Sequence, residues 1–299
     1  MVAARFIAGT VLLLAPLALN GQRGGMSRPL PQGNERETPL PTHANVVYSV
    51  ADGQKLRLDV YEPRKHTTPA PAVVLIHGGG FTGFDRSVMD SDASKLAQAG
   101  FVSFSIDYRL LKPRHPVRNA WPAQLLDCQS AVRWIRQHAT EYHVDPDRLG
   151  AYGHSSGGLL AALLGLTDAG DPAAPSISSR VRAVVDMSGV SDFTSDRDPD
   201  GDALFATLFG GTEGQLPEVW RDASPVFHVG PGDPPFLIMH GTRDQDVAIH
   251  QSLELVEALR KAGATVTFLR VNDDHFLRND AVRRRIIAEA VDFFSSALR

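Results

Sequence analysis

The sequence contains a single cysteine, Cys128, among its 299 residues. One cysteine excludes an intramolecular disulfide, and no group of Cys and His residues has the spacing of a zinc site. Cys128 lies among apolar residues such as Leu125 and Val132, so we expect it to be packed in the core. We therefore expect neither a metal nor another cofactor in the chemistry.

The sequence also has no surplus of positive charge. Its 30 Lys and Arg residues are outnumbered by 34 Asp and Glu residues, which gives a formal net charge of −4 at pH 7. The charged residues are interspersed rather than gathered in runs. The sequence therefore offers no basic block for a phosphate backbone, and we expect no nucleic-acid partner.

No apolar stretch near the N-terminus is long enough for a bilayer. Residues 6–19 form a stretch of 14 residues that contains Pro16, whereas a spanning helix needs about 20. We expect no stable membrane anchor. Residues 1–21 instead resemble a secretory signal peptide without a clear cleavage site, which predicts a secreted or periplasmic protein; a buried helix is the alternative. Residues 22–44, rich in Pro and Gly, are predicted to be a flexible spacer before one domain over residues 45–299.

The motif Gly153-His154-Ser155-Ser156-Gly157-Gly158 places a serine between glycines. Residues 148–152 before it are strand-like, and residues 159–164 after it are strong helix formers. A tight strand-to-helix turn that exposes a serine hydroxyl needs glycine on both sides of it. The motif predicts a nucleophile elbow with Ser155 as nucleophile, although an ordinary turn has the same composition.

A glycine loop, His77-Gly78-Gly79-Gly80-Phe81, follows the apolar run 72–76. That run is typical of a parallel strand buried on both faces. Without Cβ atoms, the loop backbone can approach a ligand and point its N–H groups at a developing negative charge. We assign the N–H groups of Gly79, Gly80 and Ser156 to an oxyanion hole; a flexible loop is the alternative.

Two further apolar runs end in residues that could activate Ser155. Residues 235–240 precede Asp244 and Asp246, and we favour Asp244 because it is the first acid after the run. Residues 265–271 precede His275, the best-placed base. His154 is its close rival, but adjacent side chains at a sharp turn usually point apart. In this scheme His275 takes the Ser155 proton, and Asp244 orients the imidazole.

The order of elements predicts an α/β fold. Residues 46–61 favour an antiparallel hairpin, and from residue 72 onward strand patterns alternate with helix patterns. Such alternation predicts a mostly parallel central sheet with helices on both faces. Residues 190–234 are rich in Asp, Gly and Pro, and we expect a small cap there rather than a simple long connection.

Together, these motifs resemble those of the α/β-hydrolase superfamily over nearly everything after Asn45. The glycine loop, Asp107-Tyr108-Arg109-Leu110 and the serine motif are similar to those of hormone-sensitive-lipase-type and carbohydrate-esterase-like proteins, including the BD-FAE-type esterases. Three further segments favour the BD-FAE-type branch: residues 58–63, 121–134 and 145–148.

The resemblance implies a serine carboxylic-ester hydrolase without cofactor, acting on small acyl esters, with acetyl or feruloyl esters of carbohydrates as candidates. Phe81 stands where a tryptophan is common, which makes it the candidate pocket residue and leaves carbohydrate specificity open. Two alternatives remain. A serine peptidase of prolyl-oligopeptidase type shares fold and triad order, although such enzymes usually carry a large N-terminal propeller. A non-catalytic relative used for binding should have lost a triad member, and none is lost.

Overall fold

The structure is a computed structural model that describes residues 40–65, 69–114, 116–170, 176–195 and 199–299. The predicted signal peptide and nearly all of the predicted spacer lie outside these ranges. Within them, no helix has the length and apolar character needed to cross a bilayer.

Eight strands form one sheet in the order β1-β2-β4-β3-β5-β6-β7-β8. The hairpin strands β1 (His43–Ala51) and β2 (Gln54–Tyr61) pair antiparallel, and β2 also runs antiparallel to β4. All later pairings are parallel, so the predicted mostly parallel sheet with an antiparallel opening is confirmed. The parallel strands are β3 (Ala70–Ile76), β4 (Val102–Ile106), β5 (Val144–His154), β6 (Ala183–Met187), β7 (Phe236–Gly241) and β8 (Val266–Val271).

Burial explains which runs become central strands. Every residue of β4 and β6 is buried, as expected for strands covered on both faces, while β1 at the sheet edge is largely exposed. The parallel strands also share a direction, so their carboxyl ends lie along one edge. Residues that follow the strands meet at this edge, where sites of parallel sheets form.

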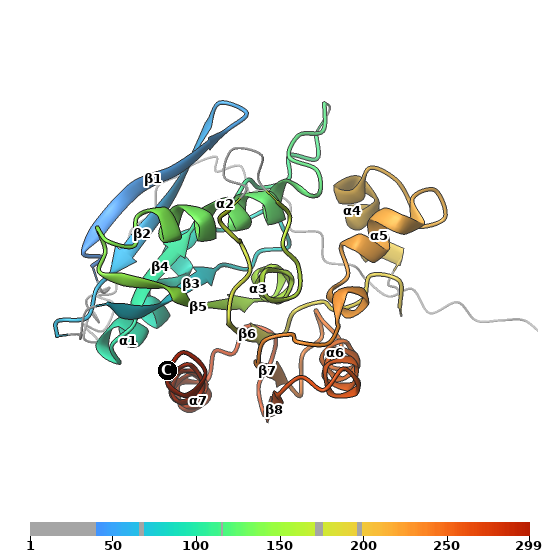
Figure 1. The fold of residues 1–299 in the computed structure, drawn as a ribbon. Helices are drawn as coiled ribbons and strands as arrows, with labels where there is room; N and C mark the ends of the chain where they lie inside the picture. The colour runs from blue at the N-terminus through green and yellow to red at the C-terminus, as the bar shows by residue number, and fades with distance from the viewer. Residues whose placement is uncertain (1–39, 66–68, 115, 171–175, 196–198) are drawn as a thin grey trace, which may run out of the picture. The chain divides into compact units, whose positions relative to one another are not determined.

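Helices cover both faces of the sheet, as Figure 1 shows. On one face, α1 (Asp90–Gln98) and α7 (Asp280–Ala297) share a core cluster that includes Leu96, Ile286 and Phe294. On the other face, α2 (Ala123–Gln137), α3 (Ser156–Leu166) and α6 (His250–Lys261) contribute to a larger cluster. Cys128 on α2 is fully buried and unpaired in that cluster.

The stretch after β6 contains helices rather than a structureless connection. It holds α4 (Pro199–Phe209), α5 (Pro217–Asp222) and the short 3₁₀ helix η2 (Pro225–His228). Phe209 lies at the centre of its packing, with its ring centroid 5.0 Å from those of Phe193 and Trp220. The segment therefore has an aromatic core of its own, as the helical spacing of these aromatic residues suggests. Its role as a cap stays a prediction.

Candidate active site

Ser155 occupies a sharp turn between β5 and α3, with φ 56° and ψ −123°. A Cβ at Gly153 would lie 2.0 Å from the Gly157 carbonyl oxygen, and one at Gly157 would lie 2.1 Å from that of Ile76. No side chain fits at those distances, so the turn requires both glycines. The Ser155 N–H donates to the Met187 carbonyl at 2.8 Å, which holds the turn against β6.

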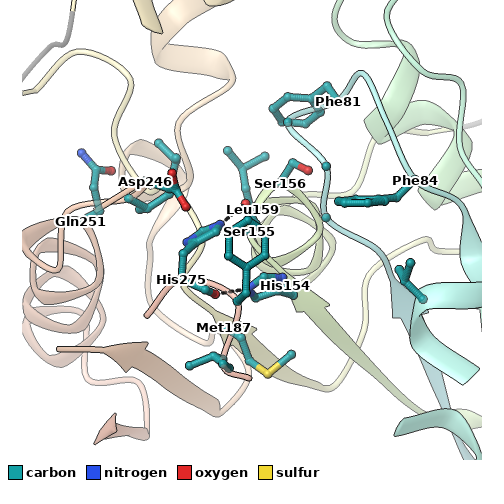
Figure 2. Close-up of a pocket in the computed structure, with 18 of the residues that line it drawn as sticks. Phe81, Phe84, His154, Ser155, Ser156, Leu159, Met187, Asp246, Gln251 and His275 are labelled. Carbon is teal, nitrogen blue, oxygen red and sulfur yellow. Dashed lines mark hydrogen bonds between the residues drawn. The ribbon is translucent and has the colours of Figure 1, made fainter. Parts of the chain in front are cut away.

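His275 connects Ser155 to Asp244. Its Nε2 lies 2.9 Å from the Ser155 Oγ, and its Nδ1 lies 2.7 Å from the Asp244 Oδ2. The loop after β8 provides His275, and the turn after β7 provides Asp244. Figure 2 shows the imidazole beside Ser155. This geometry suits transfer of the hydroxyl proton to Nε2 while Nδ1–H donates to the carboxylate.

The Asp244 carboxylate is fully buried and heavily hydrogen-bonded. Its Oδ1 accepts the N–H groups of Asp246 at 3.0 Å and Val247 at 2.8 Å. Burial alone would raise the pKa of Asp244, but contacts from His240, His275 and the Val247 N–H outweigh burial and hold that pKa well below its usual range. Asp244 is therefore a carboxylate at any pH near neutrality.

Asp246 is the alternative acid, and it is exposed on the pocket wall. Asp244, Asp246 and His275 have donor atoms within 4.8 Å of one another, a grouping among the described residues that could reach a metal ion. The structure hydrogen-bonds Asp244, not Asp246, to His275. Asp244 and His275 thus form a chain of hydrogen bonds that ends at Ser155.

His154 bonds to the backbone of His275 rather than to the Ser155 hydroxyl. Its Nε2–H donates to the His275 backbone carbonyl at 2.7 Å, below the elbow. Burial, together with the nearby His275, lowers the pKa of His154 to about 4. At neutral pH His154 is therefore an uncharged donor that fixes the loop carrying His275.

The glycine loop after β3 lies across from Ser155. Gly79 and Gly80 have φ values of 114° and 57°. Among the residues that the structure describes, no backbone acceptor is paired with either N–H group, and both glycines line the pocket with Ser155. Ser156 begins α3, whose N-terminus favours negative charge. His77 has a structural role. Its ring stacks on that of Tyr108, and its carbonyl oxygen accepts a hydrogen bond from the Tyr108 hydroxyl at 3.0 Å.

A pocket of about 850 Å³ opens over Ser155. Figure 2 shows Phe84 and Gln251 on opposite sides of Ser155. The 3₁₀ helix η1 (Arg86–Met89), the His275 loop and α7 contribute the apolar residues Val88, Met89, Leu277 and Ile286 to the Phe84 side, and the ion pair of Asp92 with Arg283 also lines the pocket. We call this side the apolar arm. On the Gln251 side the lining contains Phe193 and Phe205 together with the polar residues Asp192, Ser195, Asp246 and His250. We call this side the polar arm.

Phe81, the candidate pocket residue, lines the pocket but is 3% exposed. Its carbonyl accepts the Leu111 N–H at 2.8 Å, which anchors the glycine loop. The more exposed aromatic residue at the mouth is Phe84, at 60%. Sequence reasoning missed Phe84 and also His240, which contacts Asp244. The available signal for His240 was a histidine at the end of an apolar strand, where a buried polar group needs partners.

Comparisons with known proteins identify the family of this chain. A family model described as BD-FAE matches residues 58–259. The esterase LipC of Mycobacterium tuberculosis is 35% identical over 214 residues, which are 68% of this chain and 52% of LipC. The chain thus spans about half the length of this curated relative.

Solved structures resemble nearly the whole chain. A truncated carbohydrate esterase from gut microbiota is 27% identical, with a TM-score of 0.76 over 88% of this chain and 98% of that one. Butyrate-bound esterase 2 of Thermogutta terrifontis is 27% identical, with a TM-score of 0.74 over 86% and 94%. The latter esterase is also known phosphonylated by sarin. With about two thirds of its residues matched by the family model, the chain belongs to the BD-FAE family, and it has the α/β-hydrolase fold of the solved esterases.

Proposed function

We propose that this protein is a serine carboxylic-ester hydrolase in which Ser155 is the nucleophile, His275 the general base and acid, and Asp244 the orienting carboxylate. The hydrogen-bonded series Ser155–His275–Asp244 at the floor of an open pocket carries the proposal. An unassisted serine hydroxyl is a poor nucleophile, and this series supplies the base and the group that orients it.

The reaction proceeds in two halves. The Ser155 Oγ attacks the ester carbonyl while His275 Nε2 takes its proton, and the N–H groups of Gly79, Gly80 and Ser156 stabilise the oxyanion. His275 then protonates the departing alcohol, which leaves an acyl-enzyme. Water attacks the acyl carbon with His275 again as base, and the acid and free Ser155 are released.

The two arms of the pocket favour different parts of an ester. The departing alcohol oxygen must approach His275 Nε2, and a carboxylate oxygen of Asp246, on the polar arm, lies within 4.8 Å of a His275 ring nitrogen. We therefore place the alcohol in the polar arm and the acyl group in the apolar arm. Small acyl groups such as acetyl, or a feruloyl group, on a hydroxyl-rich alcohol such as a sugar fit this division. The solved carbohydrate esterase and the butyrate-bound esterase support it.

A substrate panel tests the proposed function. We expect p-nitrophenyl acetate to be hydrolysed faster than esters of longer acyl chains, and acetylated xylan or feruloyl esters to be hydrolysed faster than prolyl peptide anilides. Folded protein that hydrolyses none of the esters would contradict the proposal. Faster cleavage of the peptide anilides would favour the peptidase alternative.

Export to the periplasm or the medium is part of the proposal, because residues 1–21 have the pattern of a signal peptide. We expect the protein produced in a bacterial host to be recovered outside the cytoplasm without these residues. N-terminal sequencing of the recovered protein measures this, and an intact N-terminus in the cytoplasmic fraction would contradict it.

A further inference from the structure

His240 at the end of β7 is a fully buried histidine that no step of the proposed reaction uses. Its Nε2 lies 2.9 Å from the Val247 carbonyl oxygen and 3.3 Å from the Asp244 Oδ2. Its Nδ1 lies 2.7 Å from the Ser252 Oγ on α6. The ring thus has a polar partner for each nitrogen, and one of those partners is the carboxylate that orients His275.

The partners of His240 fix the position of its proton. A backbone carbonyl can only accept, so Nε2 carries a hydrogen and donates it to Val247. The same N–H faces the Asp244 Oδ2. In the neutral ring Nδ1 then accepts the hydroxyl hydrogen of Ser252, a residue that is 1% exposed. Ser252 therefore holds the ring in the tautomer that presents N–H to Asp244.

We propose that His240 is a positioning residue for Asp244, and that Ser252 fixes the orientation of His240. The inference rests on the proposed function, in which Asp244 orients His275. His240 and His275 approach the same oxygen, Oδ2, from two sides, at 3.3 Å and 2.7 Å. The two N–H groups share this carboxylate oxygen, so removing the His240 N–H leaves its negative charge to His275 alone.

Several other charged or titratable groups among the described residues act on this cluster or on its neighbours, among them Arg283 of α7, which acts on His154. Asp186 on β6 interacts electrostatically with His240, and His154 on β5 interacts with both Asp244 and His275. Asp246 lies beside Asp244 on the same turn. These groups remain in place when His240 or Ser252 is replaced, so a change in the titration of His275 in such variants reports the lost contact.

The test compares His240→Leu, which removes the N–H, with His240→Gln, whose amide can restore a donor near Nε2, and with Ser252→Ala. The readout is the midpoint of the His275 titration. It is measured by ¹⁵N NMR of resting protein with labelled histidine. We expect the midpoint to rise by about half a pH unit in His240→Leu, to rise less in Ser252→Ala, and to return toward the wild-type value in His240→Gln. His228→Leu, a change at a half-buried histidine on η2, should leave the midpoint unchanged.

An unchanged midpoint in folded His240→Leu would overturn the proposal. If that variant does not fold, an unchanged midpoint in Ser252→Ala would overturn it. The NMR readout needs no turnover, so failure of the inference differs from failure of the proposed function. If the wild-type protein hydrolyses no ester but the His275 midpoint still shifts in the variants, the coupling between His240 and Asp244 stands and the proposed esterase activity is contradicted. In active protein, the acidic limb of kcat/KM should move with the midpoint.

Discussion

The two walls of the pocket are held together by different forces. The wall at the carboxyl edge of the sheet is a network of hydrogen bonds: the Asp244 carboxylate alone accepts from His275, Asp246 and Val247. The wall formed by residues 190–195 and 199–228 depends on packed aromatic rings, with Phe209 and Trp220 at its centre. Directional bonds set the angles that proton transfer needs, whereas packing sets the shape of a cavity.

This difference separates chemistry from selection. A change in the hydrogen-bonded wall should alter turnover of every ester, because every ester uses the same proton transfers. A change in the aromatic wall should alter which esters are accepted, because it changes volume and contact area. The following variants test that separation.

The largest expected effect is that of Asp244→Asn. An amide in this position favours the wrong tautomer of His275, and we expect kcat/KM for p-nitrophenyl acetate to fall about 10⁴-fold. Asp246→Asn is the matched control on the same turn and should reduce it less than about tenfold. Steady-state kinetics with both proteins measures the ranking. The reverse ranking would assign the orienting role to Asp246.

Trp220→Ala should cost stability rather than chemistry. The indole is 1% exposed, and its Nε1–H donates to the Gly211 carbonyl at 3.0 Å. Removing a buried tryptophan lowers the free energy of unfolding by about 3–5 kcal/mol. Urea denaturation measures this, with Phe227→Ala, at a side chain that is 39% exposed, as the control. Equal losses in both variants would mean that Trp220 does not organise this wall.

Asp186→Asn tests a buried charge on the hydrogen-bonded side. Burial raises the pKa of Asp186 to about 6, although the Gly189 N–H donates to its carboxylate at 3.0 Å. The folded state binds the proton more tightly than the unfolded chain, so stability falls as pH rises from about 4 to about 6.

An asparagine keeps an acceptor for Gly189 and removes this pH dependence. We expect a gain of about 1–3 kcal/mol above pH 6 and no gain near pH 4. Thermal unfolding of both proteins across this pH range checks it. A gain that does not depend on pH would mean that ionisation of Asp186 is not the cause.

The smallest effect should come from Phe205→Ala and Phe84→Ala, one in each arm of the pocket. Loss of an aromatic contact changes discrimination between substrates by about 1–2 kcal/mol. Phe205→Ala should change the dependence of kcat/KM on the alcohol, and Phe84→Ala its dependence on acyl chain length. Both should hydrolyse p-nitrophenyl acetate within about fivefold of wild type. The opposite pattern would mean that the acyl group lies in the polar arm and the alcohol in the apolar arm.

The hydrogen-bonded wall was the part that sequence could predict. A serine between glycines and a glycine loop after a buried strand are local patterns whose geometry follows from backbone sterics. Asp244 and His275 could be named because parallel strands bring the residues after them to one edge. The hydrogen bond at 2.7 Å that selects Asp244 over Asp246 depends on a turn that spacing alone does not determine.

The aromatic wall and the outer helices were harder to predict. The sequence did not lead us to α1 or α7, although Ile286, Ile287, Ala290 and Phe294 on α7 have helical spacing. Helices α4 and α5 are short and separated by residues rich in Gly and polar side chains, so their pattern is weak over any one window. His240 was missed because its role depends on partners on α6 and on the following turn, which are brought together only by the fold.

Covalent labelling of the resting protein tests the central claim most directly. A fluorophosphonate should modify one residue, Ser155, located by mass spectrometry of the digested protein, and labelling should be lost in Ser155→Ala. Ser156→Ala is the neighbouring control and should still be labelled, because its backbone N–H is retained. Equal labelling of Ser155→Ala and wild type would contradict the account.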